Sequence, residues 1–156
     1  MKPRIVISQG DPAGIGPEVV AKALQDPAIA ALATYTVVGE TPTALEIGKV
    51  SAAAGRAALD AVRTSAEMCL RGEADAMVTA PLNKEAVTLT GVHFTGHTEF
   101  IAEICGAKTS RMLLVNDRMR VLHVTTHCSL EAATRSSEER VLTTLRLGHE
   151  ALAWLG

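Results

Sequence analysis

The chain has 156 residues, which is the size of one ordinary domain and enough to bury a hydrophobic core. Hydrophobic residues make up 47% of the sequence, but no apolar run approaches the ~18 residues that a membrane span needs. The net charge of −2 comes from interspersed acids and bases and aromatic residues are only 3%, so the composition argues against nucleic acid or a membrane as a partner.

The amino terminus and the cysteines favour a cytoplasmic protein. The apolar run in MKPRIVIS is short and strand-like and lacks the core of a signal peptide. Cys69, Cys105 and Cys128 are odd in number, widely spaced and free of any CxxC pair. They predict reduced thiols rather than a disulfide framework or a zinc ribbon, and Cys128 in particular is expected to be a small buried residue.

The first half of the chain alternates predicted strands and helices. Three apolar, β-type runs predict strands over residues 4–9, 34–39 and 75–81. Segments rich in helix formers predict helices at 17–24, 51–72 and 83–89. Pro17 suits the first turn of its helix, where a missing N–H costs nothing, and Glu18 suits the positive helix start.

The second half is predicted to contain a helix, a hairpin and a final helix. GHTEFIAEICGA (96–107) indicates a loop that leads into a helix, with Thr98 as the N-cap. Two strands over 110–117 and 119–127 are separated by a tight turn and favour a hairpin. Ser136 and Glu139 match a capping box that would open a last helix through Trp154.

Strands and helices that alternate with short connections are typical of an α/β fold, with a mostly parallel sheet and helices on both faces. We expect one such unit over residues 1–156. Two features indicate that it is shortened. No strand is predicted between residues 39 and 51, and the chain ends at Gly156, after a helix that such folds normally connect to another strand.

The loop in SQGDPAGIGPEVV allows two interpretations. Strand, glycines and helix start suggest a dinucleotide-binding turn, in which Glu40 would contact the ribose. However, Gly10, Gly14 and Gly16 give G-x-x-x-G-x-G rather than G-x-G-x-x-G, and Asp11 would repel a pyrophosphate. The alternative is a tight turn whose glycines serve backbone shape and close packing.

Histidines are the main candidates for metal binding or acid–base chemistry. His123 and His127 are four residues apart, but on a strand they would lie ~13 Å from each other, too far to share an ion. His127 is predicted to end its strand, where open α/β sheets bind ligands, although position alone favours a histidine that is hydrogen-bonded to a loop. His93, His123 and His149 are expected to be structural.

An anion site is predicted farther upstream. His97 and Thr98 fall at a probable helix start, where backbone N–H groups and the helix dipole favour negative charge. Lys84 follows the predicted strand at 75–81 and could face the same cleft, or it could be a solvated lysine at a helix start.

Four motifs in order, GDPAGIGPE, TAPLNKEA, FTGHTEF and RVLHVTTH, give the sequence a specific resemblance. It resembles the 4-hydroxythreonine-4-phosphate dehydrogenase family, including the paralogues that act on 4-phospho-D-threonate and D-erythronate 4-phosphate. The resemblance covers nearly the whole chain but only the N-terminal half of the family pattern, with a stretch missing near 46–48. It implies a fold similar to the isocitrate and isopropylmalate dehydrogenases, which bind NAD without a Rossmann fingerprint.

The resemblance implies a set of roles. His127 would be one of three histidines that hold a divalent metal (Zn, Mg, Mn or Co) at a site built from both subunits of a homodimer, and so a catalytic residue. The phosphorylated substrate would be held by His97 and Thr98, and Lys84 is a further candidate because of its position after the strand at 75–81. Gly10, Asp11 and Gly14 would belong to a turn that borders the cleft and its NAD cofactor.

The reaction implied is oxidation and decarboxylation of a phosphorylated hydroxy acid such as 4-phosphohydroxythreonine, as in pyridoxal phosphate biosynthesis. Two alternatives stay open. One is a non-catalytic remnant that keeps an anion site and a dimer surface. The other is a small Rossmann domain, with the pyrophosphate at Gly10–Gly16 and Glu40 on the ribose.

Overall fold

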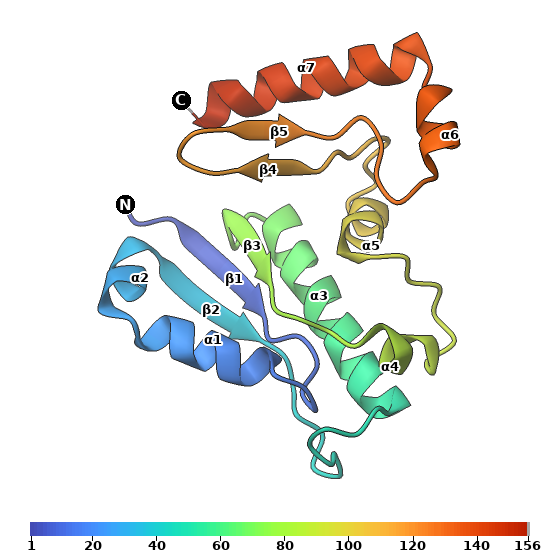
Figure 1. Cartoon of the computed structure of the whole chain (residues 1–156). Coiled ribbons are helices and arrows are strands. Elements are labelled where there is room, and N and C mark those ends of the chain that lie inside the picture. Colours follow the sequence, from blue (N-terminus) through green and yellow to red (C-terminus); the bar gives the residue numbers. More distant parts are fainter. Residues whose placement is uncertain (156) are drawn as a thin grey trace. The chain divides into compact units, whose positions relative to one another are not determined.

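The computed structural model of the protein describes residues 1–155. They divide into two compact units, Met1–Lys108 and the part from Thr109 onward (Figure 1). The first unit contains a three-stranded parallel sheet and the second a two-stranded antiparallel sheet. The predicted α/β class is confirmed.

The sheet of the first unit has the strand order β2-β1-β3. Its strands are β1 (Arg4–Ser8), β2 (Thr34–Val38) and β3 (Ala76–Thr79), slightly shorter than predicted. Ser8 at the end of β1 pairs with Val38 on one side and with Thr79 on the other. The carboxyl ends of all three strands therefore meet at one edge, which is where open α/β sheets bind their ligands.

Five helices accompany this sheet, of which α2 was not predicted. They are α1 (Gly16–Gln25), α2 (Pro27–Leu32), α3 (Ala52–Leu70), α4 (Lys84–Thr88) and α5 (His97–Ile104). The Oδ1 atom of Asp26 accepts a hydrogen bond from the N–H of Ala28 at 2.8 Å. The Asp26-Pro27 pair that predicts the end of α1 therefore also starts α2, because an N-cap aspartate followed by proline is a favourable helix start.

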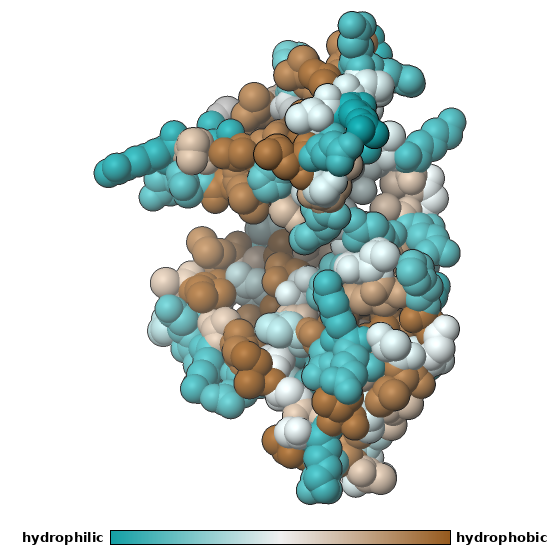
Figure 2. Space-filling model, turned by 45° about the vertical axis from the view of Figure 1, so that its right-hand side comes forward, coloured by the Kyte–Doolittle hydropathy of each residue, from teal (hydrophilic) through white to brown (hydrophobic). Residues whose placement is uncertain are grey.

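Helices pack on both faces of the sheet, as predicted. One core cluster joins the sheet to α1 and contains Ile7, Val20 and Ala80. A second joins α3 to α4 and α5 and contains Leu59, Val62, Val87 and Phe100. Val6 is fully buried, on the opposite side of β1 from Ile7, where α3 crosses β1 and β3. Outside these clusters, exposed apolar side chains lie in groups among polar ones on the face that Figure 2 shows.

The second unit begins with the predicted hairpin. Its strands β4 (Leu113–Val115) and β5 (Arg120–Leu122) pair antiparallel. Asn116 forms the turn between them, because its Oδ1 atom accepts hydrogen bonds from the N–H groups of Arg118 and Met119. Two helices follow, the short α6 (Leu130–Thr134) and the long α7 (Glu138–Leu155).

Two of the predicted helix caps are wrong. Gly96 precedes α5 in the N-cap position, so Thr98 lies within the first turn of the helix. For α7, the Ser137 hydroxyl accepts from the N–H of Arg140 at 3.2 Å, whereas the Ser136 hydroxyl donates to the Ala133 carbonyl. The α7 cap lies one residue later than predicted, because two adjacent serines offer the same chemistry.

Candidate functional site

Loops from three strands meet at the carboxyl edge of the parallel sheet. The N–H of Gln9, just after β1, donates to the Val38 carbonyl at the end of β2, at 2.9 Å. The N–H of Asp11 donates to the Pro81 carbonyl, just after β3, at 2.9 Å. The loop after β1 is therefore tied to the ends of both neighbouring strands.

Gly10 is required by a close backbone approach. Its φ is +75°, and a Cβ atom there would lie 2.1 Å from the Pro81 carbonyl oxygen. Any side chain would push the loop after β1 away from the loop after β3. This is the backbone-shape interpretation of the glycine-rich loop.

The N–H groups that a phosphate cradle would offer are used inside the loop. Asp11 is 6% exposed, and its Oδ1 atom accepts from the N–H of Ala13 at 2.8 Å. The N–H of Gly14 donates to the Asp11 carbonyl at 3.0 Å, and that of Asp11 itself is bonded to Pro81. A pyrophosphate here would have to break these bonds and face a buried carboxylate, so the geometry argues against a Rossmann-type turn.

Lys84 and His97 are brought close together by the segment between α4 and α5. Lys84 is the first residue of α4, and its ammonium donates to the Thr95 carbonyl at 3.3 Å. Asn83 starts that helix by accepting from the N–H of Ala86 at 3.1 Å, which places Lys84 directly after the β3 loop. An exposed cation therefore lies beside the start of α5.

His97 is half-buried, and its surroundings favour the neutral imidazole. Burial first, and then the positive charge of Lys84, lower the pKa of His97 below its ordinary range. Its Nε2 atom is buried and has no hydrogen-bond partner among residues 1–155. The Phe94 ring packs edge-on against the imidazole, with 5.7 Å between the ring centroids. The imidazole thus has a polar atom that is available for a hydrogen bond.

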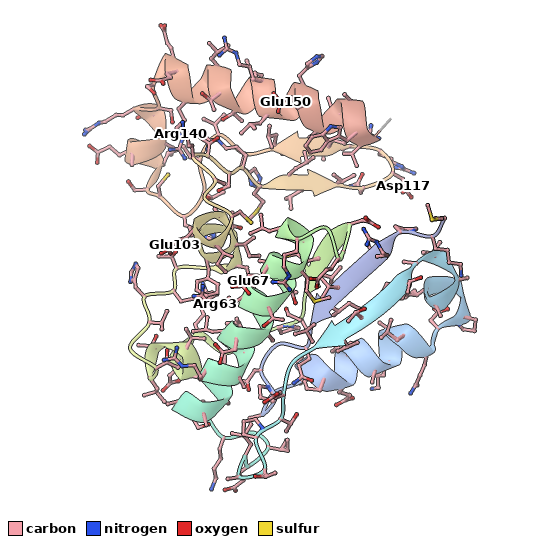
Figure 3. All side chains as sticks on the ribbon, turned by 180° about the vertical axis from the view of Figure 1, so that it is seen from behind. Arg63, Glu67, Glu103, Asp117, Arg140 and Glu150 are labelled. Carbon is pink, nitrogen blue, oxygen red and sulfur yellow. The ribbon has the colours of Figure 1, made fainter. Side chains whose placement is uncertain are left out.

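Thr98 belongs to the same cluster. It lies in the first turn of α5, half-buried, and its hydroxyl makes no hydrogen bond to another residue of the described range 1–155. The first N–H groups of a helix have no partner within the helix. On the far side, Phe100 of α5 packs on α3, where the Arg63 guanidinium lies 5.4 Å from its ring centroid (Figure 3). Packing therefore fixes α5, and its free end carries the polar groups.

His127 does not end a strand, contrary to the prediction. Strand β5 stops at Leu122, and His127 follows in an irregular segment before α6. Its φ is +49°, in the left-handed region, and the residue is exposed. The last hydrogen bond between the two arms of the hairpin is donated by the His123 N–H to the Met112 carbonyl, at 3.0 Å. After His123, the β-branched residues that predict a continued strand leave the hairpin.

A complete metal site is not formed by residues 1–155, which contain no group of three His, Cys, Asp or Glu side chains placed to hold an ion. The exposed imidazole of His127 fits the role of one ligand and needs further donors from elsewhere. Cys128, expected to be buried, is exposed, because it lies in the same irregular segment. Among residues 1–155, no helix is both long and apolar enough to cross a membrane.

The family model described as "Pyridoxal phosphate biosynthetic protein PdxA" matches residues 10–155. The chain belongs to this family. It is 34% identical to a 4-hydroxythreonine-4-phosphate dehydrogenase of Geobacter metallireducens, over 97% of this chain and 57% of that protein. It is 36% identical to the D-threonate 4-phosphate dehydrogenase of Salmonella typhimurium, over 81% of this chain and 51% of that protein.

Solved structures support the same family assignment. A 4-hydroxythreonine-4-phosphate dehydrogenase from Burkholderia phymatum superposes with a TM-score of 0.90 at 31% identity, over 98% of this chain and 59% of that one. The enzyme of that name from Klebsiella pneumoniae superposes with a TM-score of 0.89 at 30% identity, over 100% of this chain and 60% of that one. The family resemblance stated from the four motifs is confirmed.

The chain is shorter than the PdxA relatives in two respects. It spans about 57% of the length of the first curated relative. In addition, that match is 193 residues long, whereas 97% of 156 residues is about 151, so about 40 matched positions have no residue here. The connection from residue 39 to 51, where an omission is predicted, contains no helix or strand.

Sequence reasoning missed two parts of the site. Pro81 holds the loop after β1 through its carbonyl, and Phe94 packs against His97. Both residues lie within the motifs TAPLNKEA and FTGHTEF. Only the folded chain shows that the carbonyl at position 81 accepts a hydrogen bond from the N–H at position 11.

Proposed function

We propose that this PdxA-family chain carries the N-terminal part of an NAD-dependent dehydrogenase that oxidises and decarboxylates a phosphorylated hydroxy acid. The substrate would resemble 4-phosphohydroxythreonine, as in pyridoxal phosphate biosynthesis. The observation that carries the proposal is the cluster of Lys84, His97 and Thr98 at the start of α5, in a family whose relatives are named as dehydrogenases of such compounds.

The cluster suits an anionic, hydroxyl-bearing substrate. The Lys84 ammonium supplies a positive charge, and the first N–H groups of α5 and the Thr98 hydroxyl supply donors for phosphate oxygens. The surroundings of His97 favour its neutral form, in which the imidazole offers one donor and one acceptor, and this suits a hydroxyl group rather than a second charge. Charge recognition and hydroxyl recognition are thus divided between two side chains.

The metal and the cofactor complete the proposal. His127 would be one ligand of a divalent metal (Zn, Mg, Mn or Co), with the other ligands from outside the described residues, in a homodimer with a shared active site. Such a metal beside the alcohol lowers its pKa and polarises the carbonyl that forms. The turn that contains Gly10, Asp11 and Gly14 would border the bound NAD, which would supply the hydride acceptor. We place the protein in the cytoplasm.

The test measures NADH formation from 4-phosphohydroxythreonine and from phosphothreonate, with each metal added in turn. Lys84→Met and Thr98→Val should each raise KM at least about tenfold, since each removes a group that binds the anion. His127→Ala should abolish turnover but leave phosphate binding intact. Lys108→Met, an exposed lysine outside the cluster, is the matched control. Full activity in His127→Ala would contradict the metal role.

The second candidate is a non-catalytic remnant that binds a phosphorylated compound without turnover. It is favoured by about 40 positions within the match to the Geobacter metallireducens relative that have no residue here, and by the lack of a three-ligand metal group within residues 1–155. Phosphate binding that depends on Lys84, together with no NADH under any metal, would select it over the enzyme.

A further inference from the structure

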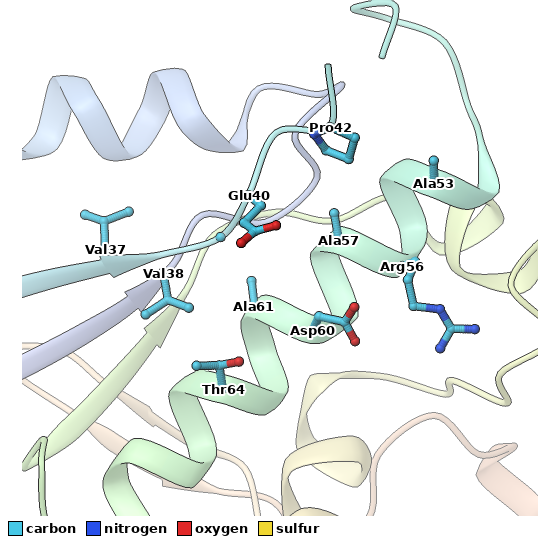
Figure 4. A pocket seen from close by; sticks show the side chains of 11 residues that line it. Val37, Val38, Glu40, Pro42, Ala53, Arg56, Ala57, Asp60, Ala61 and Thr64 are labelled. Carbon is cyan, nitrogen blue, oxygen red and sulfur yellow. The ribbon is translucent and has the colours of Figure 1, made fainter. Parts of the chain in front are cut away.

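A groove lies between α3 and the carboxyl end of β2, on the opposite side of α3 from α4 and α5. Figure 4 shows the side chains that line it, and its volume is about 730 Å³. Val38 and Glu40 form one wall, and Ala57, Asp60, Ala61 and Thr64 of α3 form the other. Leu59 and Val62, which pack toward α4 and α5, lie on the other side of the same helix.

The groove exists for two reasons. α3 packs mainly on β1 and β3, so the outer strand β2 is left partly uncovered on this face. The positions of α3 that line the groove include small side chains at 53, 57 and 61, spaced one helical turn apart. Methyl groups do not fill the space between helix and strand, so a hollow of ligand size remains.

Charge in the groove is predominantly negative. Glu40 and Asp60 make no hydrogen bond or ion pair with any other residue in the described range 1–155. The one cation, Arg56, instead donates to the Thr90 carbonyl at 3.3 Å, on the α4 side of the helix. Two carboxylates above an apolar floor therefore have no partner of opposite charge.

The open face of β2 favours a small ligand over a packed protein segment. Thr34 and Thr36 lie on the same face as Val38, because side chains alternate along a strand, and both are exposed. Beyond Val38 this face is thus polar, whereas a docked helix or strand needs a continuous apolar surface.

We propose that this groove binds a small organic cation, in which an ammonium group is attached to a compact apolar body. The apolar body rests on Val38, Ala57 and Ala61, and the ammonium lies between Glu40 and Asp60. Phosphorylated compounds are disfavoured by the same two carboxylates, so this site differs in ligand class from the Lys84 and His97 cluster and does not depend on the proposed dehydrogenase activity.

The test uses the full chain and three probes of similar shape. Benzylamine is charged at pH 7, benzyl alcohol is neutral and benzoate is anionic, and NMR follows the methyl signals of Val38, Ala57 and Ala61. We expect benzylamine alone to shift them in a saturable way, and raised salt to weaken its binding. Equal binding of benzyl alcohol, binding of benzoate, or no shift with benzylamine would overturn the proposal.

Substitutions identify the groups responsible. Glu40→Gln and Asp60→Asn keep the shape and remove one charge each, so each should weaken benzylamine binding about tenfold. Ala57→Leu should fill the groove and abolish binding. Glu85→Gln, an exposed carboxylate on α4, is the matched control, and all variants should keep the wild-type circular dichroism spectrum. Unchanged affinity in both Glu40→Gln and Asp60→Asn would reject the site.

Discussion

At the scale of single residues, one ion pair fastens the amino ends of β1 and β3 together. The Arg4 guanidinium donates to Asp75, with 2.7 Å between Nη2 and Oδ1, and the Arg4 N–H donates to Oδ2 at 2.8 Å. The N–H of Asp75 returns a bond to the Arg4 carbonyl at 2.8 Å. Backbone and side-chain hydrogen bonds thus join the same two residues, whereas an isolated surface ion pair has only the contact between its side chains.

This pair predicts a dependence of stability on acid pH. The hydrogen bonds from Arg4 lower the pKa of Asp75 to about 2 from its ordinary value of 3.8. Because the folded-state value is the lower one, the contribution to stability is complete above about pH 4 and is lost as pH falls toward 2. Urea unfolding from pH 6 to pH 2 should show this loss, and Asp75→Asn should flatten it. Glu85→Gln should retain the wild-type slope.

Polar contacts rather than a buried apolar cluster connect the elements of the second unit. Thr144 of α7 is 3% exposed, accepts from Arg111 Nε at 2.8 Å and donates to the Arg140 carbonyl at 2.7 Å. Arg140 Nε in turn donates to the Val124 carbonyl at 2.7 Å (Figure 3). Helix α7 therefore holds the segment that leads from β5 to His127.

Removal of the Arg140 side chain should loosen this segment. Arg140→Ala deletes the bond to Val124 and should lower the free energy of unfolding by about 1 kcal/mol. Amide exchange at residues 124–127 should quicken in the same variant. Arg146→Ala, on the same helix but without a hydrogen bond or ion pair within residues 1–155, is the control. An equal effect in the control, or unaltered exchange at 124–127, would contradict the role of Arg140.

On the scale of the whole molecule, the two units differ in how they are stabilised. The first has two apolar core clusters and a central strand, β1, that is paired on both sides. The second has a ladder of three residue pairs, and Leu114 at its centre is 53% exposed. Burial of apolar surface is the main stabilising contribution in folded proteins, so the first unit should be the more stable.

Hydrogen exchange measures this difference directly. We expect the amides of Val6 and Ile7 to exchange at least about tenfold more slowly than those of Leu114 and Val121, because local opening needs less free energy where less surface is buried. Equal protection in the two sheets would contradict the expected difference in stability.

The alternating pattern of the sequence is sufficient for the long elements. The runs at 4–9 and 34–39 and the alanine-rich stretch at 51–72 are each found as predicted, because propensity and periodicity agree over their whole length. Short elements were less predictable. Helices α2 and α6 have six and five residues, too few for a periodic pattern, and their start depends on a single cap at Asp26 or Ser129.

What the sequence alone determined is the α/β class, the order of the elements and, through four motifs, the family. These are local properties, set by residue spacing along the chain. Only the tertiary structure decided how the glycine-rich loop is used, that Lys84 lies beside His97, and that His127 lies outside its strand. Each of these depends on a contact between residues distant in the chain, or on where strand pairing stops, and a linear pattern does not contain that information.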